Sequence, residues 1–283
     1  MNQLRRARPW LGTLVEISAS ADLDTPVLLA AIDAAYAAVA AVHLAMSVHQ
    51  ADSELSRLNA TAHRQTVAVS AGLLTVLGAA LTFARDSDGA FDPVVGGRLT
   101  ALGLLPACEP LAAAQASWRD VLIDEPGGVR FRQPLRLDFG GIAKGHAVDL
   151  AIAALQAAGV VEAQVNAGGD LRLFGPQPQR IALRDPRAPS RLSQVIELHD
   201  QALATSAPYY AAGVSARSLI DPRSGDPYLG TDSVSVVAPS CLVADALTKV
   251  ALFASRERLE ALLERHEAQL LIQSPNPEKP DDE

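Results

Sequence analysis

Apolar residues recur along the chain with two different periods, and each period predicts one kind of element. Between residues 24 and 46, leucine, isoleucine, alanine and valine return every three or four positions, the spacing of one helix face. Pro26 falls in the first turn of this predicted helix, where proline is tolerated. The same spacing predicts helices over residues 71–86, 142–158, 244–253 and 256–266.

Shorter runs rich in β-branched residues predict strands over residues 11–18, 121–123, 129–131, 161–165, 171–174, 195–198 and 233–237. These strands are interspersed with the helices without strict alternation, which favours an α+β fold of mixed sheets with packed helices. No low-complexity tract divides the chain, so we expect one domain over residues 1–273. The last ten residues are rich in proline and charge and predict a disordered tail over 274–283.

Composition narrows the classes of function. Hydrophobic residues make up 49% of the 283 residues but aromatic residues only 4%, which predicts a large aliphatic core. The formal net charge of −8 argues against binding nucleic acid or an anionic membrane surface. The start of the chain carries arginines but no secretory signal, and we see no apolar run of about 18 residues that could span a bilayer. We therefore expect a cytoplasmic protein.

Four short clusters combine glycine with carboxylates or lysine. They cover residues 89–93, 137–145, 166–170 and 221–225, and the segment 244–249 follows them with Asp245, Thr248 and Lys249. Glycine lets the backbone approach a ligand closely. The six histidines form no metal-binding motif, and neither a serine-hydrolase nor a phosphate-loop motif occurs.

Two of these polar residues each allow two interpretations. Lys144 lies at the start of a predicted helix, where a cation is unfavourable unless an anion faces it. It either binds a phosphate or diphosphate or is an exposed lysine at an ordinary strand–helix turn. Asp245 is either a helix-capping residue or a Mg²⁺ ligand that needs further oxygens, such as that of Thr248.

The order of these motifs along the chain resembles that of the ApbE family, the FAD:protein FMN transferases. The matching segments are residues 11–13, 46–49, 52–59, GAFDPVVG, LDFGGIAKGHAVD, NAGGD, residues 204–206, LIDPRSG and ADALTKVALF. The resemblance implies an ApbE-like fold with an FAD cleft between lobes and a Mg²⁺ ion near the diphosphate. It also implies transfer of FMN from FAD to a hydroxyl in the Ser/Thr flavinylation motif of an acceptor flavoprotein, with release of AMP.

The resemblance also implies roles for individual residues. The residues expected to bind FAD are Leu11, His49, Ala90, Phe91, Asp92, Asp138, Lys144, Leu219 and Lys249. Gly141, through its carbonyl, and Asp245 are expected to bind the metal, with Thr248 as a further candidate. Asp245 and Ser218 stand at the expected catalytic positions.

This chain departs from the family pattern at two of those positions. The family has a histidine where Ser218 stands, and serine is a poor base. It has a metal-binding threonine where Lys249 stands, and a protonated lysine cannot bind Mg²⁺. One hypothesis is that the Lys249 ammonium takes the place of the metal, so that FAD binds without Mg²⁺. A non-catalytic FAD-binding protein and an FAD pyrophosphatase are therefore alternative functions.

Overall fold

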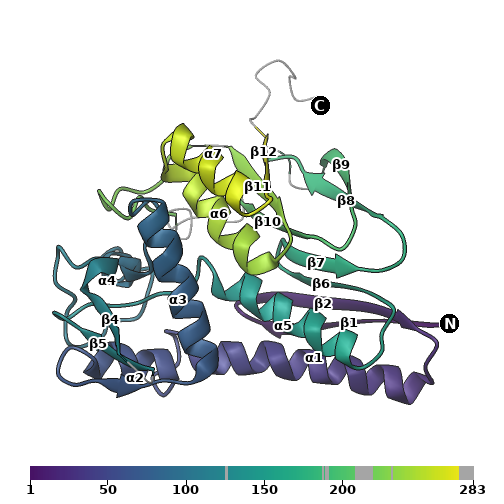
Figure 1. Ribbon diagram of the computed structural model, residues 1–283, viewed down its shortest axis with the longest axis horizontal. Helices are drawn as coiled ribbons and strands as arrows, with labels where there is room; N and C mark the ends of the chain where they lie inside the picture. Colours follow the sequence, from purple (N-terminus) through teal and green to yellow (C-terminus); the bar gives the residue numbers. More distant parts are fainter. Residues whose placement is uncertain (125–126, 187, 189–190, 208–218, 231, 274–283) are drawn as a thin grey trace.

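A seven-stranded antiparallel sheet forms the larger lobe of the computed structural model (Figure 1), in the order β1-β2-β6-β7-β10-β11-β12. The structure describes the whole chain except residues 125–126, 187, 189–190, 208–218, 231 and 274–283. The strands of the sheet are β1 (Asn2–Trp10), β2 (Thr13–Ala21), β6 (Glu162–Ala167), β7 (Asp170–Phe174), β10 (Ala202–Ser206), β11 (Ser233–Ala238) and β12 (Gln269–Gln273).

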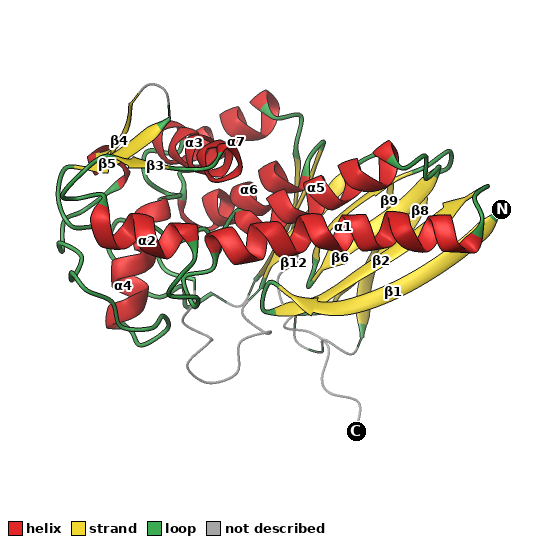
Figure 2. Cartoon of the chain, turned by 90° about the horizontal axis from the view of Figure 1, so that it is seen from below, coloured by secondary structure: helices red, strands yellow, loops and turns green. Residues whose placement is uncertain are grey.

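Helices cover one face of this sheet. Along it lie α1 (Thr25–Met46), α5 (Ala143–Ala157) and α6 (Cys241–Phe253), with α1 packed on α5 and α5 packed on α6. The helix α7 (Arg256–Arg265) follows α6 and contacts it. Figure 2 shows α1 running along the sheet beside β1 and β2. Alternate residues such as Val15, Ile17 and Val165 point into this aliphatic core and are fully buried.

The smaller lobe contains the remaining helices and a second sheet (Figure 1). It comprises α2 (Glu54–Thr61), α3 (Ala71–Asp86), α4 (Gly96–Ala101), the 3₁₀ helices η1 (Pro93–Val95) and η2 (Trp118–Asp120), and a sheet of β3 (Val67–Ala68), β5 (Gly128–Phe131) and β4 (Val121–Asp124). The mixture of helices with antiparallel sheets confirms the predicted α+β class.

A hairpin of β8 (Gln179–Arg184) and β9 (Leu192–Leu198) crosses the other face of the large sheet. Its inward side chains join a separate apolar cluster with β7, β10 and β11, made of Leu171, Leu173, Leu183, Leu198, Leu203 and Val237. The hairpin covers only part of this face. Polar side chains of β2 and β6 occupy the rest.

All five predicted helices and all seven predicted strands correspond to elements of the structure, with shifted bounds. The sequence pattern predicted no apolar run able to span a bilayer, yet α1 is long and apolar enough by length and composition alone to do so. The sequence pattern did not indicate this property, because many of the apolar residues in this helix are alanines. The helix has eight buried residues and packs against α5 and the sheet, as the core helix of a globular domain does.

Candidate functional site

A cavity of about 480 Å³ lies where the smaller lobe meets the edge of the large sheet. Nine residues expected to bind the flavin nucleotide or its metal line it, namely His49, Ala90, Phe91, Asp92, Asp138, Gly141, Lys144, Leu219 and Lys249. They come from five segments far apart in the sequence. Leu11 and Thr248 do not line the cavity, Asp245 lies buried behind its wall, and Ser218 falls outside the described residues.

Asp92 directly follows Ala90 and Phe91 in the chain. Its carboxylate accepts hydrogen bonds from the backbone N–H groups of Val94 (2.8 Å) and Trp118 (3.2 Å), so it begins η1 and ties that turn to the neighbouring loop. Loss of hydration raises the pKa of Asp92 to about 6, although both backbone donors oppose the shift. The carboxylate is thus held rigidly at the cavity wall.

A side chain from α2 positions the segment that carries Asp138. The Asn59 amide donates to the Leu137 carbonyl (2.9 Å) and accepts from the Leu137 N–H (2.8 Å), which satisfies both backbone groups of a fully buried residue. Asp138 itself accepts from the Gly140 N–H at 3.0 Å, and burial raises its pKa. The two hydrogen bonds of Asn59 thus tie the segment 52–59 to the glycine-rich segment 137–145.

Two lysines and two aspartates form a closed charge cluster in the cavity wall. Lys144 Nζ pairs with Asp170 Oδ2 and lies 3.6 Å from Asp245 Oδ2. Lys249 Nζ pairs with Asp245 Oδ1 and donates to the Asp245 carbonyl at 3.1 Å. The charges of the two ammonium groups balance those of the two carboxylates. Because these ion pairs also fix the positions of the ammonium groups, a negatively charged ligand would meet two cations already held in place.

Burial and pairing act in opposite directions on the pKa values of this cluster. Burial disfavours the charged form of Lys144, but Asp170 and Asp245 outweigh it and raise the pKa of that ammonium. Burial likewise raises the pKa of Asp245, but Lys144 and Lys249 hold it below its usual range. For Asp170, burial and the neighbouring Asp245 carboxylate prevail, and its pKa is raised. Lys144 therefore stays charged, and the two neighbouring ammonium groups favour the ionised form of Asp245.

The structure excludes one of the two interpretations for each of these residues. Lys144 is not an ordinary exposed lysine, because it faces two buried carboxylates and only 29% of its side chain is exposed. Asp245 is not a cap, because α6 begins at Cys241 and Ser240 provides the capping oxygen. Asp170 also belongs to the cluster, although the motifs predicted no role for it. Its position directly after two glycines was the feature of the sequence that could have indicated a role in the site.

The expected Mg²⁺ ligands do not fit a divalent ion as they are arranged. Both carboxylate oxygens of Asp245 already face ammonium groups, and Oδ2 also accepts from the Gly145 N–H at 3.2 Å. The Thr248 hydroxyl donates to the Asp245 carbonyl (2.7 Å) and bonds to the Ser206 hydroxyl (2.8 Å), so it is already engaged within the protein. Within the described part of the chain, no group of three His, Cys, Asp or Glu residues could hold a metal.

Comparisons with known proteins agree with this geometry. The model of the ApbE family matches residues 11–272. The chain is 32% identical to an FAD:protein FMN transferase of Vibrio cholerae over 80% of this chain and 74% of that protein. It is 35% identical to one of Rhodobacter capsulatus over 73% of this chain, but there it spans only 43% of the relative's length.

Solved structures give the same result over nearly the whole chain. The flavin transferase ApbE from Vibrio cholerae superimposes with a TM-score of 0.81 and 30% identity, covering 96% of this chain and 93% of that one. An ApbE protein from Thermotoga maritima gives a TM-score of 0.84 at 27% identity, covering 96% and 94%. From the matched motifs, the fold and the cavity that they line, this chain belongs to the ApbE family.

Proposed function

We propose that this chain is an FAD:protein FMN transferase, which moves the FMN moiety of FAD to a hydroxyl of an acceptor flavoprotein. One observation carries the proposal: residues from five separate segments meet in one cavity, beside two ammonium groups. That combination suits a ligand that is part apolar ring and part diphosphate. The relatives that share this architecture are named for the same reaction.

In the proposed reaction, a Ser or Thr hydroxyl oxygen of the acceptor forms a bond to the FMN-side phosphorus. The bond from that phosphorus to the AMP phosphate oxygen breaks, the hydroxyl proton passes to a base and from there to solvent, and AMP leaves. Lys144 and Lys249 would offset the negative charge on the phosphates, the main requirement of phosphoryl transfer. His49 lines the cavity and is the candidate base among the described residues.

The resemblance also predicts Mg²⁺, and here the arrangement of this chain favours a different source of positive charge. In our proposal Lys249 supplies the charge that a divalent ion would supply, because its ammonium lies against Asp245 and in the cavity wall. The same observation favours a second candidate function, an FAD-binding protein that transfers FMN slowly or not at all.

One incubation distinguishes these functions. The protein is mixed with FAD, with Mg²⁺ or with a chelator, and with a purified flavoprotein domain that carries a Ser/Thr flavinylation motif. An acceptor band that fluoresces on a denaturing gel, and disappears when the acceptor hydroxyl is replaced by alanine, supports transfer. Free FMN and AMP without labelled acceptor indicate a pyrophosphatase, and intact FAD that co-elutes with the protein indicates a binding protein.

A further inference from the structure

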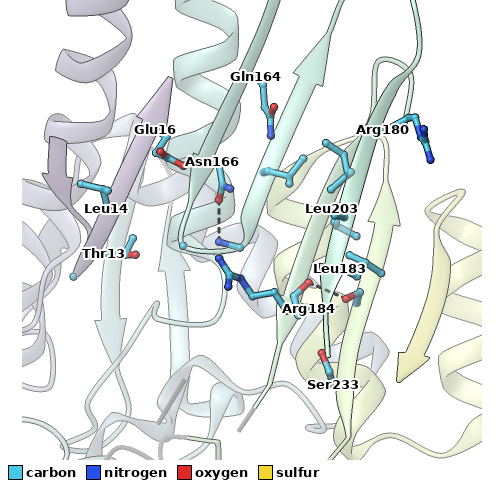
Figure 3. A pocket seen from close by; sticks show the side chains of 18 residues that line it. Thr13, Leu14, Glu16, Gln164, Asn166, Arg180, Leu183, Arg184, Leu203 and Ser233 are labelled. Atoms are coloured by element: carbon cyan, nitrogen blue, oxygen red, sulfur yellow. Dashed lines mark hydrogen bonds between the residues drawn. The ribbon is translucent and has the colours of Figure 1, made fainter. Parts of the chain in front are cut away.

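A second hollow, of about 730 Å³, lies on the face of the large sheet that carries no helices (Figure 3). Its floor consists of side chains from β2 and β6, among them Glu16, Gln164 and Asn166. Its wall is β8. The hairpin covers only the neighbouring apolar part of this face, so the floor of the hollow is polar.

The wall of this hollow is the edge of a strand. Five consecutive residues of β8, Arg180 to Arg184, line it. Successive side chains of a strand point to opposite sides, so a surface lined by all five faces the strand's edge. Among the strands that the structure describes, β8 pairs only with β9. Over Arg180 to Leu183, its other edge therefore offers main-chain groups to a further strand.

Two observations connect the hollow to the flavin cavity and to a binding partner. Gly168 and Thr205 line both spaces, so the hollow and the flavin cavity adjoin at these two residues. Ser233, which is 1% exposed, lines the hollow, and its hydroxyl has no hydrogen-bond partner among the residues that the structure describes. A buried hydroxyl without a partner is uncommon and indicates that something else completes the surface.

We infer that the acceptor protein docks in this hollow as an extended segment, which adds a strand to the edge of β8 over Arg180 to Leu183 and carries its hydroxyl past Gly168 and Thr205 to the flavin phosphates. The inference rests on the proposed transferase function. When a peptide adds a strand to a sheet edge, main-chain hydrogen bonds provide the affinity, and pockets for its side chains provide specificity for its sequence.

The test uses the full chain, FAD and a purified acceptor domain with a Ser/Thr flavinylation motif. Gln164→Trp fills the floor of the hollow. Val195→Trp is the control, because Val195 lies on β9 of the same hairpin and does not line the hollow. Each variant is checked for its unfolding midpoint, its Kd for FAD, its KM for the acceptor and its binding of the acceptor by anisotropy.

We expect Gln164→Trp to raise the acceptor KM by about tenfold or more, with the FAD Kd changed by less than about twofold. Val195→Trp should change neither quantity. If the unmodified protein transfers FMN and Gln164→Trp leaves the acceptor KM unchanged, the docking site is refuted while the transferase function stands. If the unmodified protein transfers nothing, the proposed transferase function is refuted. The anisotropy measurement then tests the docking site by itself. Acceptor binding that Gln164→Trp weakens supports the docking site, and acceptor binding that is absent or unchanged in this variant refutes it.

Discussion

Replacing Lys249 with threonine should convert the binding of FAD from metal-independent to metal-dependent. Lys249 lies between the two residues expected to bind a metal, because a Cβ built on Gly141 would be 3.6 Å from Lys249 Cε and Lys249 Nζ pairs with Asp245. Lys249→Thr removes that ammonium, frees one carboxylate oxygen of Asp245 and introduces a hydroxyl. The variant thus has the oxygen donors that Mg²⁺ requires.

The size of the effect follows from the charges. A single ammonium about 4 Å from a phosphate, at an effective dielectric of about 20, contributes about 4 kcal/mol. Water entering the vacated space recovers part of this, so we expect FAD binding to weaken by about 2–4 kcal/mol, or about 30- to 1,000-fold in Kd. Added Mg²⁺ should recover most of that loss in Lys249→Thr.

Titration calorimetry or flavin fluorescence, with either a chelator or Mg²⁺, measures the Kd for FAD. The matched control is Lys249→Met, which removes the charge but adds no oxygen, so Mg²⁺ should not rescue it. The unmodified protein should have the same Kd with and without the chelator. An affinity that collapses when the unmodified protein is chelated would refute the reasoning, as would a Lys249→Thr variant that binds FAD normally without Mg²⁺.

Three further substitutions test the supports of the cavity. Asn59→Ala leaves both backbone groups of buried Leu137 unpaired and should cost about 2–4 kcal/mol in urea unfolding, whereas Asn2→Ala, which removes one exposed bond, should cost less than about 0.5 kcal/mol. Gly145→Val places a side chain into the backbone at the start of α6 and should lower the melting temperature by more than about 4 °C; an unchanged value would show that the two helices are not in contact. The pKa of Asp92 is raised from 3.8 to about 6, so its contribution to stability is full below pH 3.8 and is lost as pH rises through about 6, by at most about 3 kcal/mol. Asp92→Asn should remove that part of the pH dependence from unfolding curves, and an unaltered profile would contradict the assignment.

The sequence carried most of the information about helices and about which segments belong to the site. Helices such as Ala71–Asp86 have both a clear apolar period and a serine cap, so local chemistry is enough to predict them. The strands β1 and β8 have few buried positions, and only pairing with distant partners makes them strands. A pattern of burial cannot indicate a strand that is mostly exposed.

The charge cluster shows the same limit at the site. Lys144 and Asp245 are 101 positions apart, and only the packing of α5 against α6 brings them together. The motif order indicated that both residues belong to the site. It could not indicate that they pair with each other, or that Asp170 and Lys249 complete the cluster.

The helix α1 has a mechanical consequence for catalysis. Its 22 residues extend about 33 Å, and it contacts β1, β2 and α5 of the larger lobe as well as α2 and α3 of the smaller one. One rigid rod thus joins the two halves that border the flavin cavity, and His49 follows directly after its end. Rotation of the two halves about a hinge at this point would have to bend the helix or break its contacts with one of them, so α1 opposes a change in the width of the cavity.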